Sequence, residues 1–378
     1  MEIYLDNSAT TRVCPEAAEA AMLAMTDNYG NPSALHANGI RAKQLLEKSR
    51  KQVADILSAQ PEEIYFSHSG TLANNSAIIG AVGMRRRIGT RIVTSSVEHP
   101  SVSRTMDELE KKGFEIVRLP PRTNGAVDPE DLMNAVNEKT ILISLMYVNN
   151  ETGAINPVEY ANKAVKASKC HALIHIDATQ AFGKMSVKPR KIGADFVTIS
   201  GHKVHAPKGV GALYVKKNLV LPNYIFGGGQ ESGLFSGTEN MPAIAGFGAA
   251  CDALPDPLTS QREMKKLRRR MLTQLAAIPT IHINSPDNAL PNIINMSIFG
   301  MPSQVLVNFF SERGIYVSAG SACKKGHRSE VLTEMKLAPI RIDSAIRVSL
   351  SRYNTEEDID LFVKAAIEAS EFLRNRVF

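Results

Sequence analysis

The sequence predicts an α/β protein with a large, mostly parallel sheet domain and a smaller α+β domain. Short apolar runs alternate with helical patterns over the first two thirds of the chain, which is typical of strands joined by crossover helices. After 253–257 this alternation stops, and a long basic helical pattern precedes separate strand-like runs. With 378 residues, the chain is also long enough for two or three domains.

The strands of the large domain are predicted from apolar runs that each end in polar residues. Because helical patterns separate these runs, we expect a parallel sheet that is covered on both faces. Helices are expected to begin at Pro15 and at Pro100, since proline is favoured in the first helical turn. The predicted strands lie at 64–66, 91–94, 114–117, 140–145, 172–176 and 194–199.

The boundary between the domains is predicted at 253–257, where two prolines interrupt the pattern. An amphipathic helix at about 259–277 follows, then strands at 293–298 and 345–350, and a final helix from about Glu356. We therefore expect a large domain of residues 15–255 and a small domain of residues 1–14 plus 256–378.

The composition excludes several classes of protein. A hydrophobic fraction of 44% and a charged fraction of 22% are ordinary for a globular chain. No apolar run approaches the ~20 residues that a membrane span needs, and the acidic opening at Glu2 is unlike a secretory leader. Four cysteines are too few for a disulfide framework, so reduced thiols and a cytoplasmic location are expected.

The net charge of +6 is mild, and its basic runs at 85–87 and 265–270 are interpreted as solvated helix faces. Neither run is interleaved with the aromatic residues that stack on bases, so no nucleic-acid partner is expected. A preference for small anionic ligands fits the charge equally well.

Polar residues follow the predicted strands, where an open parallel sheet binds its ligands. A lysine there can act as a nucleophilic amine, an aspartate can pair with a cationic ring nitrogen, and a Ser-Gly-Thr turn before a helix can bind phosphate. Each of these features alone is more often structural, but together they fit pyridoxal phosphate. These segments are Ser67–Thr71, Glu98–Pro100, Asn149–Glu151, Asp177–Gln180 and Ser200–Lys203.

Other sites are not expected. The chain has no nucleotide-binding P-loop and no dinucleotide-binding glycine fingerprint, and it has no nucleophile elbow. The glycines of Gly227–Gly233 have the wrong spacing and predict a loop. Cys170, His171 and His175 lie in or beside a predicted buried strand, so no metal site is expected there.

These residues resemble the cysteine desulfurases, which are class V, fold-type I pyridoxal-phosphate enzymes. The likeness runs in order from Tyr4 to about Leu361. The sequence Gly-Ser-Ala-Cys at 320–323 resembles that of the group of desulfurases that serves iron–sulfur assembly and tRNA thiolation. It rests on Asp6–Thr11, Gly30–Ser33, Val148–Glu151, His175–Gln180, Ser200–Lys203, Pro207–Gly211, Ser236–Thr238, Ser318–Cys323 and Ile346–Leu350.

The resemblance implies a role for each matching residue. Lys203 would bind pyridoxal phosphate covalently, Asp177 would keep the ring nitrogen protonated, and Gln180 would bond the ring oxygen. A neutral His99 would stack on the ring, and Arg347 would bind the substrate carboxylate. The remaining expected ligands are Gly70, Thr71, Ser200 and His202 for the phosphate, Thr238 for the phosphate of the partner subunit in a homodimer, and Asn150 for cofactor and substrate.

The implied reaction converts L-cysteine to L-alanine. The thiolate of Cys323 would take the sulfur as a persulfide and deliver it to an acceptor protein of an iron–sulfur or thiolation pathway. Two alternatives stay open on the same scaffold, a selenocysteine lyase and a cysteine-sulfinate desulfinase, and a third is a sulfur-relay or cofactor-binding protein with little turnover.

The sequence that follows Cys323 is basic. Lys324, Lys325, His327 and Arg328 follow it directly, and nearby cations favour thiolate over thiol. We therefore expect a thiol pKa below that of a free cysteine at this position. Cys14, Cys170 and Cys251 are expected to be buried structural residues.

Overall fold

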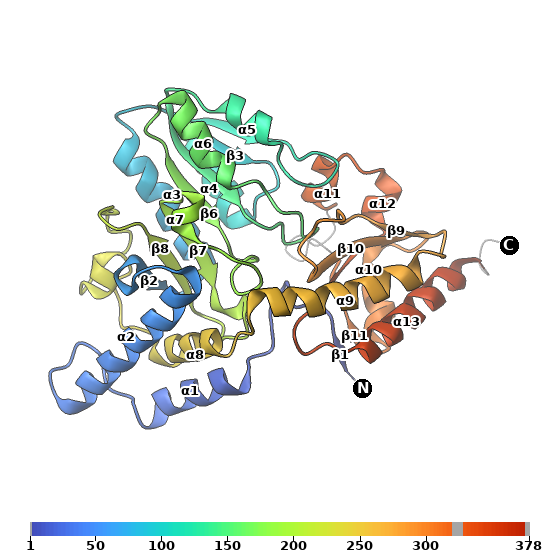
Figure 1. Cartoon of the computed structure of the whole chain (residues 1–378), viewed down its shortest axis with the longest axis horizontal. Helices are drawn as coiled ribbons and strands as arrows, with labels where there is room; N and C mark the ends of the chain where they lie inside the picture. Colours follow the sequence, from blue (N-terminus) through green and yellow to red (C-terminus); the bar gives the residue numbers. More distant parts are fainter. Residues whose placement is uncertain (1, 320–327, 375–378) are drawn as a thin grey trace.

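The structure is a computed structural model that describes residues 2–319 and 328–374. Figure 1 shows two lobes joined by the long helix α9 (Pro257–Leu275). In chain order, the larger lobe contains α1 (Pro15–Thr26), α2 (Ala37–Leu57), β2 (Ile64–Ser67), α3 (Gly70–Arg85), β3 (Arg91–Ser95), α4 (Pro100–Lys111), β4 (Glu115–Leu119), α5 (Pro129–Ala135), β5 (Thr140–Met146), α6 (Glu159–Ser168), β6 (Leu173–Asp177), α7 (Pro189–Ile192), β7 (Phe196–Ser200), β8 (Gly211–Val215) and α8 (Met241–Asp252).

The large sheet has seven strands in the order β2-β8-β7-β6-β5-β3-β4. Its four pairs from β7 to β4 are parallel, while β8 runs antiparallel to both of its neighbours. The prediction of an α/β fold with a mostly parallel sheet is therefore confirmed. The strand β8 is the exception that the sequence pattern did not indicate.

Successive residues of the central strands face opposite cores, because side chains alternate along a strand. Ile92 packs with α3 and α4 on one face, whereas Val93 packs in the core on the other face with α5 and α6. In the same way, Leu173 lies in the core that contains Ile92, and Ile174 lies in the core that contains Val93. Burial on both faces explains why these strands read as continuous apolar runs.

The smaller lobe is built on a three-stranded antiparallel sheet of order β12-β10-β9, with a separate parallel pair of β1 and β11. The N-terminal residues Ile3 and Leu5 pack in the same core as α9, α10 and α13. Besides α9, its elements are β1 (Ile3–Tyr4), β9 (Ile281–Ile283), β10 (Ile293–Ile298), α10 (Ser303–Ser311), β11 (Ile315–Tyr316), α11 (Glu330–Glu334), α12 (Pro339–Asp343), β12 (Ala345–Ser349) and α13 (Glu356–Arg374).

These contacts support the expected division into residues 15–255 and residues 1–14 plus 256–378, which stays a prediction. Helix α9 begins at Pro257, two residues earlier than expected, because the Asp256 side chain accepts from the backbone N–H of Thr259 and caps it. Within residues 2–319 and 328–374, no helix combines the length and the hydropathy needed to cross a bilayer.

Candidate active site

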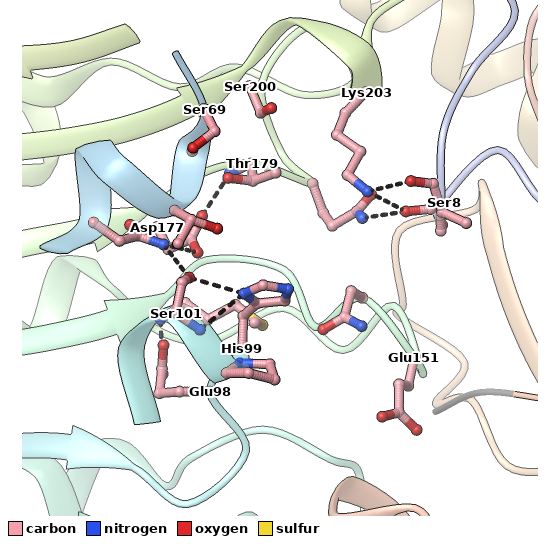
Figure 2. A pocket seen from close by; sticks show the side chains of 18 of the residues that line it. Ser8, Ser69, Glu98, His99, Ser101, Glu151, Asp177, Thr179, Ser200 and Lys203 are labelled. Atoms are coloured by element: carbon pink, nitrogen blue, oxygen red, sulfur yellow. Dashed lines mark hydrogen bonds between the residues drawn. The ribbon is translucent and has the colours of Figure 1, made fainter. Parts of the chain in front are cut away.

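A cavity of about 540 Å³ lies beyond the carboxyl ends of β5, β6 and β7, where an open parallel sheet binds ligands. Figure 2 shows side chains around it from the larger lobe and Ser8 from the N-terminal segment, and Arg347 lines it from the smaller lobe. Of the predicted site residues, the cavity is lined by Gly70, Thr71, His99, Asn150, Asp177, Gln180, Ser200, His202, Lys203 and Arg347.

Lys203 ends a short 3-10 turn, Gly201–Lys203, that follows β7 directly. Its Nζ donates to the backbone carbonyls of Ser8 and Ala9, each at 2.7 Å. Figure 2 shows this amine reaching the N-terminal segment across the cavity. The lysine is thus held at the end of a buried strand with its amine inside the cavity.

Asp177 is the last residue of β6 and is only 4% exposed. Its Oδ2 accepts from Asn74 Nδ2 at 2.8 Å, and its Oδ1 accepts from the backbone N–H of Thr179 at 3.0 Å. Both oxygens are therefore positioned by donors of the protein. A carboxylate fixed in this way can face a cationic ring nitrogen.

His99 is the N-cap of α4, where its Nδ1 accepts from the backbone N–H of Ser101 at 3.2 Å. Burial lowers the pKa of His99, with Asp177 acting against this shift and Lys203 in favour of it. A lowered pKa agrees with the expectation of a neutral ring. Asn74 Nδ2 also donates to Ser101 Oγ at 2.8 Å, so a chain of hydrogen bonds links the His99 site to Asp177.

The start of α3 carries the residues that were expected to bind the phosphate. Ser69 caps this helix by accepting from the backbone N–H of Leu72 at 3.1 Å, and Gly70 and Thr71 form its first turn beside Ser200. The free N–H groups and the dipole of a helix start favour an anion there.

His202 faces the same cavity, and burial lowers its pKa to about 4, with the charge of Lys203 as the next cause. Its Nδ1 lies 3.2 Å from Thr10 Oγ1. A neutral imidazole in this position can donate a hydrogen bond to an anion without itself being an ion.

Arg347 enters the cavity from β12 of the smaller lobe and is 3% exposed. Its Nη1 donates to the carbonyl of Asn150 at 3.0 Å, and its Nη2 pairs with Asp6 Oδ1 at 2.8 Å. Its buried Nε has no hydrogen-bond partner among the described residues. An arginine held on two sides with one unused donor is suited to bind a carboxylate.

Thr238 is the one described residue of the predicted site that does not line this cavity. Thr238 lines a smaller adjoining pocket, which shares His68, Gly209 and Val210 with the main cavity. Cys323 lies outside the described residues, as do Lys324, Lys325 and His327. Arg328 lines the cavity and is paired with Asp343 at 2.6 and 2.7 Å.

The other three cysteines are buried thiols, and burial raises the pKa of Cys14 and Cys251. No group of three histidine, cysteine or acidic side chains in the described part of the chain could hold a metal ion. His175 instead makes short contacts to Ser144 Oγ at 2.8 Å and Thr198 Oγ1 at 3.1 Å.

Sequence reasoning missed several residues of the cavity. Asn74 lies one turn into α3 and could have been found by its spacing from Gly70. Ser8 belongs to the Asp6–Thr11 motif, but only the fold brings its carbonyl to Lys203. Asn74 acts through its side-chain amide and Ser8 through its backbone carbonyl. Such groups give little signal in a single sequence.

Glu98 is the most perturbed of the missed residues. Its Oε1 accepts from Ser95 Oγ at 2.5 Å and from the backbone N–H of Met146 at 2.8 Å, and its Oε2 has no partner in the described part of the chain. Burial raises the pKa of Glu98 to about 8, and the negative charge of Asp177 adds to this shift. Burial therefore favours the neutral form of Glu98, while the hydrogen bonds from Ser95 and Met146 act against this shift.

Comparison with known proteins agrees with this geometry. Residues 3–362 match the family Aminotransferase class-V. The chain is 39% identical to cysteine desulfurase IscS of Methanosarcina thermophila, over 99% of this chain and 93% of that protein. It is 42% identical to a NifS/IcsS protein homolog of Lactobacillus delbrueckii subsp. bulgaricus, over 96% of each chain.

Solved structures give the same result. A NifS-like protein superposes with a TM-score of 0.93 at 37% identity, covering 99% of this chain and all of the other. A NifS-like protein from Rickettsia africae has a TM-score of 0.86 at 33% identity, covering 97% and 99%. Sequence, fold and site together show that this chain belongs to the pyridoxal-phosphate-dependent class-V aminotransferase family.

Proposed function

We propose that this protein is a cysteine desulfurase that converts L-cysteine to L-alanine and transfers the sulfur to Cys323 as a persulfide. The observation that carries the proposal is the meeting of Lys203, Asp177 and Arg347 in one cavity. An amine, a carboxylate and a guanidinium in this arrangement match the aldehyde, the ring nitrogen and the amino-acid carboxylate. The name of the Methanosarcina thermophila relative, cysteine desulfurase IscS, agrees with it.

The donor set of the cavity fits pyridoxal phosphate. Asp177 is held as an acceptor for the ring nitrogen, the start of α3 offers N–H groups to the phosphate, and the pKa of His99 is lowered as a stacking imidazole requires. When bound, the cofactor supplies a sink for the electrons released at the substrate Cα.

Substrate orientation is assigned to Arg347. The unused Nε–H of its buried guanidinium can donate to one carboxylate oxygen of the substrate, while the carbonyl of Asn150 and the carboxylate of Asp6 hold the two Nη groups. A planar fork held in this way fixes the direction of the substrate as well as its position.

Proton transfer at the substrate Cα is assigned to Lys203 Nζ. The amine lies in the cavity between the N-terminal segment and the end of β7. Its neighbours Ser8 and Ala9 offer carbonyl acceptors that hold the amine while it carries a proton. The thiolate of Cys323 would then bond to the substrate sulfur as the Cβ–S bond of the substrate breaks. The electron pair of that bond would stay with the carbon fragment, whose Cβ takes up a proton to become the methyl group of alanine.

Partners and location follow from the same proposal. The enzyme would act as a cytoplasmic homodimer, with Thr238 completing the phosphate site of the partner subunit. The pocket that holds Thr238 adjoins the cavity of its own chain, which supports a position near the subunit boundary. The sulfur acceptor would be a protein of an iron–sulfur or thiolation pathway.

The direct test is turnover of L-cysteine by the purified protein with pyridoxal phosphate and a thiol reductant. Alanine and sulfide should form in equal amounts. Alanine formation from selenocysteine or cysteine sulfinate, with none from cysteine, would replace the proposal with the lyase or the desulfinase. Formation of no alanine from any of the three would leave only a binding or relay role.

A further inference from the structure

Behind Gln180, on the side away from the cavity, lies a second lysine. Lys184 follows Gln180 by four residues in the turns after β6, and its Nζ donates to Gln180 Oε1 at 3.0 Å. Gln180 is 4% exposed and lines the cavity, whereas Lys184 does not. The hydrogen bond between these two side chains therefore acts on the site through the amide of Gln180, while the charge of Lys184 also acts on Lys203 and Arg347.

The hydrogen bonds of Gln180 fix which end of its amide faces which neighbour. Its Nε2 donates to the carbonyl of Ser8 at 3.0 Å, and the same carbonyl accepts from Lys203. Its Oε1 accepts from Lys184. Turning the amide by half a turn would set two donors together at Lys184 and two acceptors together at Ser8, so only one orientation satisfies the network.

This arrangement does not depend on the charge of Lys184. Burial lowers the pKa of Lys184 to about 7, and the charges of Lys203 and Arg347 act in the same direction. An ammonium and a neutral amine both carry N–H donors. The bond to Gln180 Oε1 can therefore persist on either side of neutral pH.

We propose that Lys184 is a positioning residue of the cofactor site, which fixes the Gln180 amide with its N–H₂ end toward Ser8, Lys203 and the cavity. This inference rests on the proposed function, because it takes pyridoxal phosphate as the ligand of the cavity. An N–H₂ group presented there binds an anionic ring oxygen, whereas an amide oxygen in the same place repels it. Lys184 thus acts on the cofactor without touching it.

The test is a double-mutant cycle on the affinity for pyridoxal phosphate. The full-length protein is freed of cofactor, and pyridoxal phosphate is added back while its absorbance is followed. Lys184→Met should weaken binding by roughly 3- to 10-fold, the scale of one buried hydrogen bond. In a Gln180→Ala background, the same substitution should weaken the binding of pyridoxal phosphate by less than about twofold. The hydrogen bond through which Lys184 acts on the cofactor is absent there.

Two further variants separate positioning from folding. Lys184→Arg keeps a cationic donor and should restore binding to within about twofold of wild type. Lys188→Met, at an exposed lysine four residues further on, should bind as wild type does. If the methionine variant does not fold, Lys184→Gln replaces it in the cycle, since its side chain is one atom shorter and does not reach Gln180.

Equal losses in the two backgrounds would overturn the inference, and so would unchanged binding by Lys184→Met. These results are distinct from failure of the proposed function. If Lys184 and Gln180 are coupled in cofactor binding but the protein releases no alanine from cysteine, only the proposed desulfurase activity is rejected. A protein that desulfurates cysteine but shows no coupling between Lys184 and Gln180 rejects only the positioning role.

Discussion

At the scale of single residues, Lys203 is the group on which the proposed chemistry depends. Lys203→Ala should abolish covalent attachment of pyridoxal phosphate and all turnover, because the amine that faces Ser8 and Ala9 is removed. Borohydride reduction followed by peptide mapping measures the attachment. Lys208→Ala, at another lysine that lines the cavity, should keep the adduct. An adduct that maps to any lysine other than Lys203 would show that the assignment is wrong.

Arg347 gives a prediction about the substrate. Lysine cannot reproduce a planar fork that is held by Asn150 and Asp6. Arg347→Lys should therefore lower kcat/KM for cysteine by roughly 30-fold, or about 2 kcal/mol, on the scale of a buried charge-assisted pair. Arg313→Lys, at an arginine paired with Glu368 on the surface, is the matched control. Equal kcat/KM values for the two variants would remove Arg347 from the substrate site.

The residues of the cavity differ in how far a sequence can reveal them. Asp177, Gln180 and Lys203 directly follow strands, so the rule that ligands bind beyond strand ends was enough to bring them together. Ser8 and Asn74 could not be found in this way. Their partners lie 195 and 103 residues away, and the contacts exist only because the N-terminal segment and α3 cross the same strand ends.

At the scale of elements, a buried ion pair ties α2 to the turn at Gln230–Gly233. Arg50 Nη1 and Nη2 bond the two carboxylate oxygens of Glu231 at 2.7 and 2.8 Å, and Arg50 also donates to the carbonyl of Ile64 in β2. Glu231 accepts a further bond from the backbone N–H of Phe66. This pair therefore fixes the segment that leads to Thr238.

Removing one partner of that ion pair should destabilise the folded protein. Arg50→Met should lower the free energy of unfolding by about 3–5 kcal/mol, because the Glu231 carboxylate would stay buried without its cation. Adding Glu231→Gln should recover part of the loss. Chemical denaturation of the three proteins measures this. A double variant no more stable than Arg50→Met alone would contradict the electrostatic explanation.

Elements of four or more residues were mostly predictable, because their apolar runs are long enough to show a period. The strands β9 and β11 have three and two residues and leave no pattern. The strand β8 is a different case, since it was not among the predicted strands and its direction is also the exception in the sheet. Its run Gly211–Val215 is apolar, but nothing local distinguishes an antiparallel neighbour of β7 from a parallel one.

At the scale of the whole molecule, stability should depend on pH through a buried histidine outside the cavity. His205 is 6% exposed, and its Nδ1 lies 2.8 Å from the carbonyl of Arg12. Burial lowers its pKa to about 4 from an ordinary 6.5, although the bond to Arg12 acts in the opposite direction. Between these values the unfolded chain binds a proton that the folded chain does not.

The free energy of unfolding should therefore fall as the pH drops from 6.5 to 4, with His205 contributing up to about 3 kcal/mol. His205→Asn should reduce this slope. Asparagine also tolerates the left-handed backbone at this position, where φ is 68°. His171→Asn, at an exposed histidine, is the control. Denaturation curves at several pH values measure how the free energy of unfolding changes with pH. An identical change in wild type and His205→Asn would contradict this explanation.

The two lobes share one site, since Arg347 comes from the smaller lobe and Lys203 from the larger. The central claim is that this shared site moves sulfur from cysteine to Cys323. A single turnover without reductant tests it most directly, with alanine measured and each cysteine peptide examined by mass spectrometry. The account predicts one alanine for each persulfide, with the persulfide on Cys323, and neither product from Cys323→Ser. Persulfide on Cys14, Cys170 or Cys251, or free sulfide formed in full by the Cys323→Ser protein, would contradict it.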